Sequence, residues 1–235
     1  MNTISKIVQD PIGFLGRALY KLFVAPLKYR GRHGYDAGRY WQDRLSRHGL
    51  SLRGVGDEGL SEEDNEKMYQ EAAQAFLALC QRERIDFPNT RVLEIGCGNG
   101  FYAHLLAEQK VQSYVGVDIT DVFFPELEKK HPDFEFVRKD VTADELNGEF
   151  DLIIMIDVIE HITSQVKLQA AFDNIRDHLA QGGVFMVAPV PEKGRRSLFY
   201  VRFWSLKDIA RNFLGFDLGE PIPFRYSRIL AIRKP

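Results

Sequence analysis

Residues 91–100 carry the strongest chemical signal in the chain. An apolar run with one acid, Glu94, breaks there into glycines at alternate positions, Gly96, Gly98 and Gly100. Glycines so placed let the backbone turn sharply after a buried strand and bring bare N–H groups against a ligand. The spacing differs from the dinucleotide fingerprint G-x-G-x-x-G, because Phe101 stands where its third glycine would lie. We expect a strand, a tight ligand-facing turn and a helix.

Acids follow three further apolar segments. Asp118 ends the segment 113–118, Asp140 follows 134–137, and Asp157 ends the almost wholly apolar segment 150–157. The last has the composition of a central parallel strand buried on both faces. Asp118 also lies at the spacing where a doubly wound fold places a carboxylate on ribose hydroxyls. Each acid alone fits an ordinary loop or helix cap, but four acids at strand ends predict one shared site.

With these segments in place, the chain resembles class I S-adenosylmethionine-dependent methyltransferases, and in particular the group that includes ubiquinone-biosynthesis O-methyltransferases. The resemblance covers roughly residues 70–235. Its first motif is specific for the cofactor, and none is specific for a substrate. The matching segments are Leu93–Gly100, Val117–Asp118, Lys139–Val141, Asp157–His161 and Val201–Leu206.

The fold and the resemblance together predict how S-adenosylmethionine binds. We expect it beyond the strand ends at 95 and 156, where strand order reverses. The loop would face its methionine part, Asp118 its ribose and Asp140 its adenine. The cofactor-binding residues expected in full are Glu94, Gly96, Cys97, Gly98, Gly100, Asp118, Ile119, Asp140, Val141 and Asp157.

Two residues after the segment 150–157 are candidates for catalysis. His161 is the candidate base, because its ordinary pKa lies near neutrality, and Glu160 stands beside it. Alternatively, the Glu-His pair only braces the loop. A third interpretation is a divalent metal site at Asp157, Glu160 and His161, since some similar enzymes bind an ion there through Glu-x-x-Glu-His. Asp157 stands where those enzymes have the longer glutamate, which argues against the same metal site here.

The acceptor site is less defined. Tyr35, Tyr40 and Trp41 are expected in a lid that contacts the acceptor, or else in a core that anchors the N-terminal segment. Arg195 is the candidate for gripping a phosphate or carboxylate. It belongs to a basic group that would otherwise be a solvated face: Lys193, Arg195, Arg196, Arg202, Lys207 and Arg211.

The composition narrows the class of protein. The chain has 235 residues, 45% of them hydrophobic, which suits one globular domain with an extension. A net charge of −2 gives no general attraction to nucleic acid, so we expect no nucleic-acid partner. Only two cysteines, Cys80 and Cys97, argue against a disulfide framework and for a reducing, cytoplasmic location.

The N-terminal segment has its own pattern. Residues 11–26 predict a basic amphipathic helix, with Leu15, Leu19 and Leu22 at helical spacing. No uncharged stretch is long enough to span a bilayer, and no secretory cleavage site precedes the basic residues at 28–30. Residues 1–30 therefore either contact an anionic membrane surface peripherally or pack on the catalytic domain.

Alternating strand and helix patterns predict an α/β fold, a doubly wound, mostly parallel seven-stranded sheet of the Rossmann-like methyltransferase type. We expect residues 1–59 as a helical extension and 60–235 as the methyltransferase domain. We expect one helix to begin at residue 61 and four others to cover 100–109, 122–130, 165–180 and 206–214. Expected strands cover 91–95, 113–118, 134–138, 151–156 and 184–188, with a closing hairpin near 216–222 and 227–233.

We expect the protein to methylate oxygen on a small or lipid-linked acceptor. N-methylation is the nearest alternative. A non-catalytic S-adenosylmethionine-binding subunit is a second, since the motifs concern binding rather than turnover. A nicotinamide-dependent oxidoreductase is a third, disfavoured by Phe101.

Overall fold

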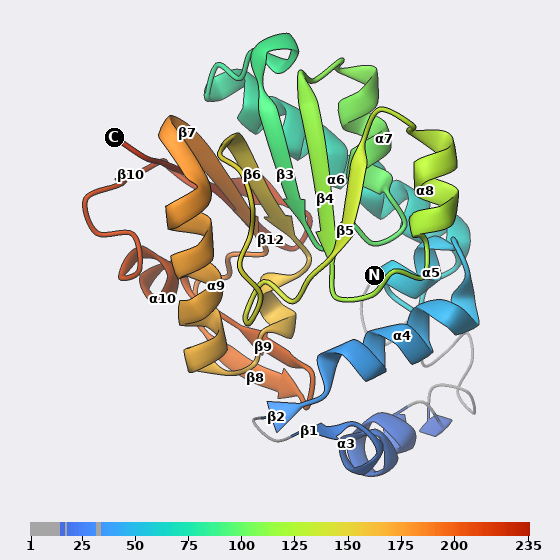
Figure 1. The fold of residues 1–235 in the computed structure, drawn as a ribbon. Coiled ribbons are helices and arrows are strands. Elements are labelled where there is room, and N and C mark those ends of the chain that lie inside the picture. The colour runs from blue at the N-terminus through green and yellow to red at the C-terminus, as the bar shows by residue number, and fades with distance from the viewer. Residues whose placement is uncertain (1–14, 17, 32–33) are drawn as a thin grey trace.

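The computed structural model describes residues 15–16, 18–31 and 34–235. A mostly parallel sheet occupies its centre (Figure 1), in the order β10-β12-β7-β6-β3-β4-β5, with β11 also paired to β12. The parallel strands are β3 (Arg91–Ile95), β4 (Ser113–Asp118), β5 (Glu135–Arg138), β6 (Phe150–Ile156) and β7 (Leu179–Ala188). The antiparallel strands are β10 (Asp217–Leu218), β11 (Ile222–Phe224) and β12 (Ser227–Arg233). The predicted fold class is confirmed.

The two faces of the sheet bury separate apolar clusters. Along β6, Leu152 and Ile154 join one cluster while Ile153 and Met155 join the other, as the two-residue period of a strand requires. The first cluster includes residues of the helices α6 (Glu62–Arg82), α7 (Phe101–Glu108) and α8 (Phe124–Lys130). The second includes residues of α9 (Gln165–His178) and α10 (Leu206–Ala210). Helices therefore cover both faces, which explains the apolar composition of β6.

The order in which strands are added to the sheet reverses between the parallel neighbours β3 and β6. Val92 pairs with Tyr114 of β4 on one side and with Leu152 of β6 on the other. Strands β4 and β5 thus extend one way, and β6 and β7 the other. The ends of β3, β4 and β6 meet at one edge, as predicted.

Some elements differ from prediction in their bounds or in kind. Helix α9 ends at His178 rather than at 180, because Leu179 pairs with Phe150 and so joins the sheet. Helix α10 begins at Leu206 as predicted, behind a capping box of Ser205 and Asp208, but ends at Ala210 rather than at 214. Residues 195–203, where no strand was expected, form the hairpin of β8 (Arg195–Leu198) and β9 (Val201–Phe203).

The N-terminal segment contains short strands besides the predicted helical backbone. Helical backbone at residues 15–16 and 18–19 leads into the π-helical η1 (Tyr20–Val24) and α3 (Ala25–Lys28). The predicted helix 11–26 thus lies partly outside the described residues. The short strands β1 (Arg30–Gly31) and β2 (Gly34–Tyr35) then lead to α4 (Ala37–His48) and α5 (Leu52–Val55), within the part expected as a helical extension. Within the described ranges, no helix is both long and apolar enough to cross a bilayer.

Candidate active site

One cleft opens at the edge where β3, β4 and β6 end. Its walls come from the glycine turn after β3, the loops after β4, β5 and β6, and the N-terminal helices. The predicted residues that line it are Tyr35, Trp41, Glu94, Gly96, Cys97, Gly98, Asp118, Ile119, Asp140, Val141, Asp157 and His161. The structure therefore brings most of the predicted site together.

The glycine turn has no room for side chains. Gly96 has φ +79°, and a Cβ atom on it would lie 2.2 Å from Cγ2 of Val158. Gly100, also at positive φ, begins α7 rather than lining the cleft; its Cβ would lie 2.3 Å from Leu127. Sequence spacing identified both positions because only glycine adopts this conformation without strain.

Asp118 joins the turn to the end of β4. Its Oδ2 accepts a hydrogen bond of 3.0 Å from the backbone N–H of Gly98, and its Oδ1 accepts one from that of Thr120. Burial raises the pKa of Asp118 above its ordinary value, and these donors partly offset the shift. The carboxylate is thus fixed at the floor of the cleft, next to Ile119.

Asp140 occupies the corresponding position after β5. Its Oδ1 accepts hydrogen bonds from the N–H and hydroxyl of Thr142, at 2.9 and 2.7 Å, and Nζ of Lys167 lies 3.8 Å from Oδ2. The carbonyl of the adjacent Val141 accepts from Asn174 of α9. Local bonds therefore hold Asp140 in place and leave a carboxylate at the cleft wall.

Glu94 is buried beneath the turn. Its carboxyl group accepts a hydrogen bond from the hydroxyl of Tyr114. Burial is the main cause that raises the pKa of Glu94 to about 8, with a further rise from the charge of Asp118. Glu94 is therefore mostly protonated at neutral pH and has a proton to donate.

A buried ion pair follows β6. Asp157, at φ +59°, pairs with Arg225, which comes from the turn between β11 and β12. Glu160 is buried, one of its carboxyl oxygens has no hydrogen-bond partner, and burial and the charge of Asp157 raise its pKa well above the ordinary value. Glu160 does not line the cleft.

These side chains do not form a metal site. The guanidinium of Arg225 already neutralises Asp157, and Nδ1 of His161 is committed to the carbonyl of Tyr200 at 3.0 Å. Throughout the described part of the chain, no three His, Cys, Asp or Glu side chains are grouped to hold an ion. The donor set at Asp157, Glu160 and His161 therefore does not fit the divalent metal considered from the sequence.

The bond to Tyr200 also fixes the form of His161. A carbonyl only accepts, so Nδ1 carries the hydrogen and Nε2 of the neutral ring keeps its lone pair. Burial lowers the pKa of His161 to about 4, so the ring is neutral at physiological pH. It is available to accept a proton, although weakly basic.

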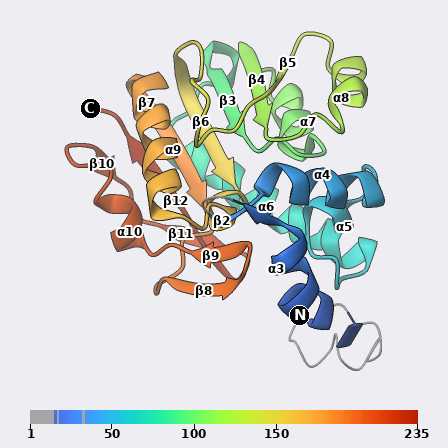
Figure 2. The same cartoon turned by 60° about the horizontal axis from the view of Figure 1, so that its bottom comes forward.

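Residues 35–58, here called the lid, form one wall of the cleft through side chains such as Trp41 and Val55. Figure 2 shows the helices α4 and α5 of this segment beside the sheet. The hydroxyl of Tyr35 donates to the carbonyl of His161, and the Trp41 and His161 rings are 4.7 Å apart. On the other side, Nδ2 of Asn99 donates to the carbonyl of Leu50 at 3.1 Å. The lid is thus bonded both to the turn and to the loop after β6.

Comparison with known proteins agrees with this geometry. Residues 93–185 match the family described as a methyltransferase domain. The magnesium protoporphyrin IX methyltransferase from Synechocystis PCC 6803 superimposes with a TM-score of 0.65 and 18% identity, over 84% of this chain and 99% of that one. Residues 93–185 thus match a methyltransferase domain, and the chain has the fold of these enzymes.

Curated relatives match the domain only in part. A tRNA U34 carboxymethyltransferase from Pseudomonas savastanoi pv. phaseolicola is 31% identical over 107 residues, 42% of this chain and 32% of the relative. A ubiquinone biosynthesis O-methyltransferase from Pseudomonas aeruginosa is 24% identical over 126 residues, 51% of this chain and 52% of the relative. The chain thus spans about a third to a half of the length of these relatives.

Two residues expected to bind the acceptor lie outside the cleft. Tyr40 points away from the cleft into an aromatic cluster, edge-on to Tyr29 at 5.1 Å and close to Tyr200 at 4.6 Å. Arg195 is exposed on β8, with its guanidinium over the ring of Phe203. Neither lines the cleft, because Tyr40 anchors the lid and the β8–β9 hairpin extends outward.

Other cleft residues were not predicted. They include Leu45 and Val55 of the lid and side chains from α6, α7, the loop after β5 and α9: Tyr69, Tyr102, Thr142 and Lys167. Thr142 follows Asp140 closely enough that its Asx-type turn was recognisable in the sequence. Arg225 had no local signal, because it reaches Asp157 only through the pairing of β11 with β12.

Proposed function

We propose that this protein is an S-adenosylmethionine-dependent methyltransferase that methylates oxygen on a small or lipid-linked acceptor. One observation carries the proposal. A side-chain-free turn and two fixed carboxylates, Asp118 and Asp140, face one cleft at the reversal of strand order. Such a site suits an elongated nucleoside with hydroxyl and amine donors.

The cleft residues fit the proposed cofactor. The bare turn at Gly96–Gly98 suits its methionine part, with the protonated Glu94 supporting the turn. Asp118, beside Ile119, suits two ribose hydroxyls, since a carboxylate accepts from both. Asp140, beside Val141, suits an exocyclic amine. When bound, S-adenosylmethionine supplies an electrophilic methyl group on a sulfonium.

The residues after β6 suit the acceptor side of the reaction. Much of the rate of an in-line displacement comes from holding the groups in place, which is the role we assign to Trp41 and the lid. Neutral His161 would accept the proton of a hydroxyl through Nε2. Its low pKa makes it a weak base, and the nearby charge of Asp157 favours the protonated form. Glu160 lies outside the cleft, so we assign it to positioning Asp157 rather than to contact with substrate.

The relatives give limited support for an acceptor class. The tRNA-modifying relative matches only 42% of this chain and 32% of its own length, so we do not infer an RNA acceptor from it. The ubiquinone biosynthesis relative is by its name an O-methyltransferase, which supports a hydroxyl acceptor. Both cysteines, Cys80 and Cys97, are buried free thiols, in keeping with action in a reducing, cytoplasmic compartment.

Methyl transfer with labelled S-adenosylmethionine tests the proposal. Purified protein is incubated with phenolic and catecholic acceptors and with matched amines, both with and without EDTA. We expect label in the hydroxyl compounds, unaffected by EDTA, and loss of at least tenfold in kcat for His161→Gln. Label only in amines would favour N-methylation. Tight cofactor binding without any transfer, including to extract metabolites, would favour a non-catalytic subunit.

A further inference from the structure

The N-terminal helical segment presents an unusual apolar surface. Most large apolar side chains in the described chain are buried, and outside the N-terminal segment the exposed ones are scattered over several elements. Six exposed ones gather between residues 15 and 27 and are here called the N-terminal apolar surface: Leu15 (59% exposed), Leu19 (49%), Leu22 (58%), Phe23 (65%), Val24 (51%) and Leu27 (76%). Contiguous exposure of this kind marks an interaction site.

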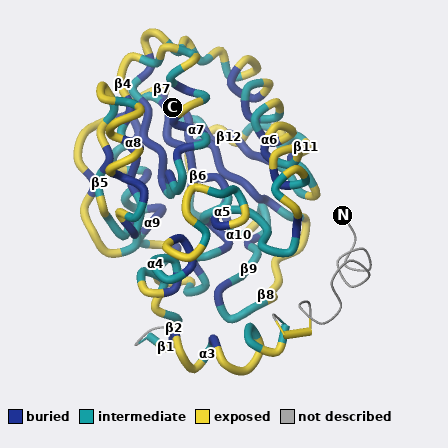
Figure 3. Tube along the Cα trace, turned by 90° about the vertical axis from the view of Figure 1, so that its right-hand side faces the viewer, coloured by how far each residue is buried: buried dark blue, intermediate teal, exposed yellow. Residues whose placement is uncertain are grey.

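The opposite face of the same segment is already packed. Ala25 and Tyr29 are buried in an aromatic cluster with Tyr40 and Tyr200. Figure 3 shows α3 as an exposed end of the molecule, next to the hairpin of β8 and β9. The apolar surface is therefore not the face by which the segment attaches to the protein.

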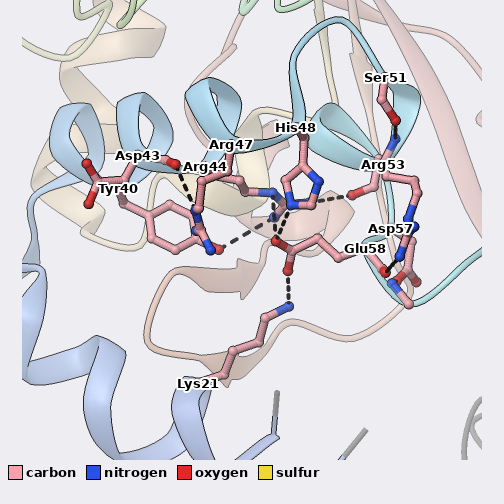
Figure 4. Close-up of polar contacts among 12 residues, drawn as sticks. Lys21, Tyr40, Asp43, Arg44, Arg47, His48, Ser51, Arg53, Asp57 and Glu58 are labelled. Carbon is pink, nitrogen blue, oxygen red and sulfur yellow. Dashed lines mark hydrogen bonds and ion pairs between the residues drawn. The ribbon is translucent and has the colours of Figure 1, made fainter. Parts of the chain in front are cut away.

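Ion pairs hold the segment in that orientation (Figure 4). Nζ of Lys21 lies 2.8 Å from Glu58, which also contacts His48 and Arg44 of the lid. Nζ of Lys28 lies 2.8 Å from Asp43 of α4. These two lysines face the protein, so the outward face keeps its apolar character.

The surroundings of this surface are basic. No acidic residue occurs from 11 to 35 or from 193 to 207, although acids slightly outnumber bases in the whole chain. The second stretch contains the β8–β9 hairpin, which packs against the segment through Leu198 and Phe199. Arg30 and the hairpin residues Arg195 and Arg196 are exposed. Apolar and basic side chains thus share one end of the molecule.

We propose that this end docks onto an anionic lipid surface. Exposed Leu and Phe side chains enter the boundary between head groups and acyl chains, and arginines beside them attract anionic head groups. A second copy of the chain is a poorer occupant, because a two-fold interface brings the same basic residues together without acids to meet them. The inference concerns adsorption alone and is independent of the proposed methyl transfer.

Vesicle co-sedimentation of the full chain tests the proposal. The probe is vesicles of phosphatidylcholine with a quarter phosphatidylglycerol, at low salt. We expect wild type to bind, and the Leu22→Gln, Phe23→Gln double variant to lose at least tenfold in partition coefficient. The matched control is Val166→Gln with Leu214→Gln, which alters side chains that are 80% and 83% exposed and lie outside the N-terminal segment. Its partition coefficient should stay within twofold of the wild-type value. Arg195→Gln with Arg196→Gln should weaken binding severalfold and reduce its salt dependence.

Three outcomes would overturn the proposal. In the first, wild type remains in the supernatant with these vesicles. In the second, the Leu22, Phe23 variant binds as tightly as wild type. In the third, sedimentation equilibrium without lipid shows a wild-type dimer that this variant dissolves, while neither protein binds vesicles; the surface is then a self-interface. Unchanged circular dichroism and melting temperature of the variant exclude loss of fold as the cause.

Discussion

The hydroxyl of Tyr35 donates a 3.0 Å hydrogen bond to the carbonyl oxygen of His161, a residue 126 positions later in the chain. This bond ties the lid to the loop after β6, where the Trp41 ring also contacts His161. Burial raises the pKa of Tyr35, so its hydroxyl remains a donor throughout the physiological range. Tyr35 and Trp41 thus connect the lid to the residues that follow β6.

Tyr35→Phe should loosen the lid without changing its packing. A neutral hydrogen bond contributes about 1 kcal/mol net, so we expect about a fivefold loss of affinity for S-adenosylhomocysteine. Titration calorimetry measures this directly. Trp41→Phe serves as a comparison that keeps the bond but reduces the ring contact. Equal affinity of wild type and Tyr35→Phe would show that the lid closes without this bond.

The glycine turn is testable by a matched pair of alanine variants. Gly96 and Gly182 both have positive φ, at +79° and +72°, but only Gly96 has a neighbour within 4 Å of the added Cβ. Gly182→Ala should therefore cost only backbone strain, about 1–2 kcal/mol in the free energy of unfolding. Gly96→Ala adds the clash with Val158 and should cost about 1–3 kcal/mol more. Urea denaturation compares them; equal losses would contradict the close approach at Gly96.

Glu94 should make stability fall as the pH rises. Its pKa is about 8 in the folded protein against an ordinary value of 4.5, so between these values the folded state holds a proton that the unfolded state has lost. The free energy of unfolding then decreases with pH in this window, by at most about 1.4 kcal/mol per pH unit. Glu94→Gln removes this contribution while keeping an acceptor for Tyr114. Urea denaturation from pH 5 to 8 should show the wild-type value falling relative to the variant, and parallel curves would count against a raised pKa.

Arg225 should matter mainly through Asp157. Its side chain is only 5% exposed, so Arg225→Met leaves a partly buried carboxylate unpaired beside Glu160. Removing one partner of a buried pair is strongly destabilising, and we expect a loss of about 3 kcal/mol. Adding Asp157→Asn should restore part of the loss, because the unpaired charge is gone. A double-mutant cycle by denaturation measures the coupling; strictly additive effects would mean that the pair contributes nothing.

The order of elements in the sheet was predictable because its signals are local. The apolar segment of β6 and the glycines after β3 specify a buried strand and a turn through residues close in sequence. The end of α9 was missed since Leu179 is recruited into the sheet by Phe150, a distant partner. The β8–β9 hairpin was missed for the same reason: its apolar residues pack on the N-terminal segment.

The carboxylates of the cleft were predictable, and its aromatic lining was less so. Asp118 and Asp140 follow strands whose ends must meet at one edge, so their convergence follows from topology. Tyr40 and Trp41 are neighbours on α4, and only the packing of the helix decides which one faces the cleft. Arg225 enters through a hairpin turn near the C-terminus, and no spacing in the sequence relates it to Asp157.

The most direct measurement is calorimetric titration of S-adenosylhomocysteine into wild type, Asp118→Asn and Asp121→Asn. Asp121 is an exposed carboxylate shortly after the same strand and provides the control. Bonds to a charged acceptor contribute about 1.5–3 kcal/mol, so Asp118→Asn should bind at least tenfold more weakly, while Asp121→Asn stays within twofold. Absence of binding to wild type, or equal affinity for wild type and Asp118→Asn, would contradict the assignment of this cleft to the cofactor.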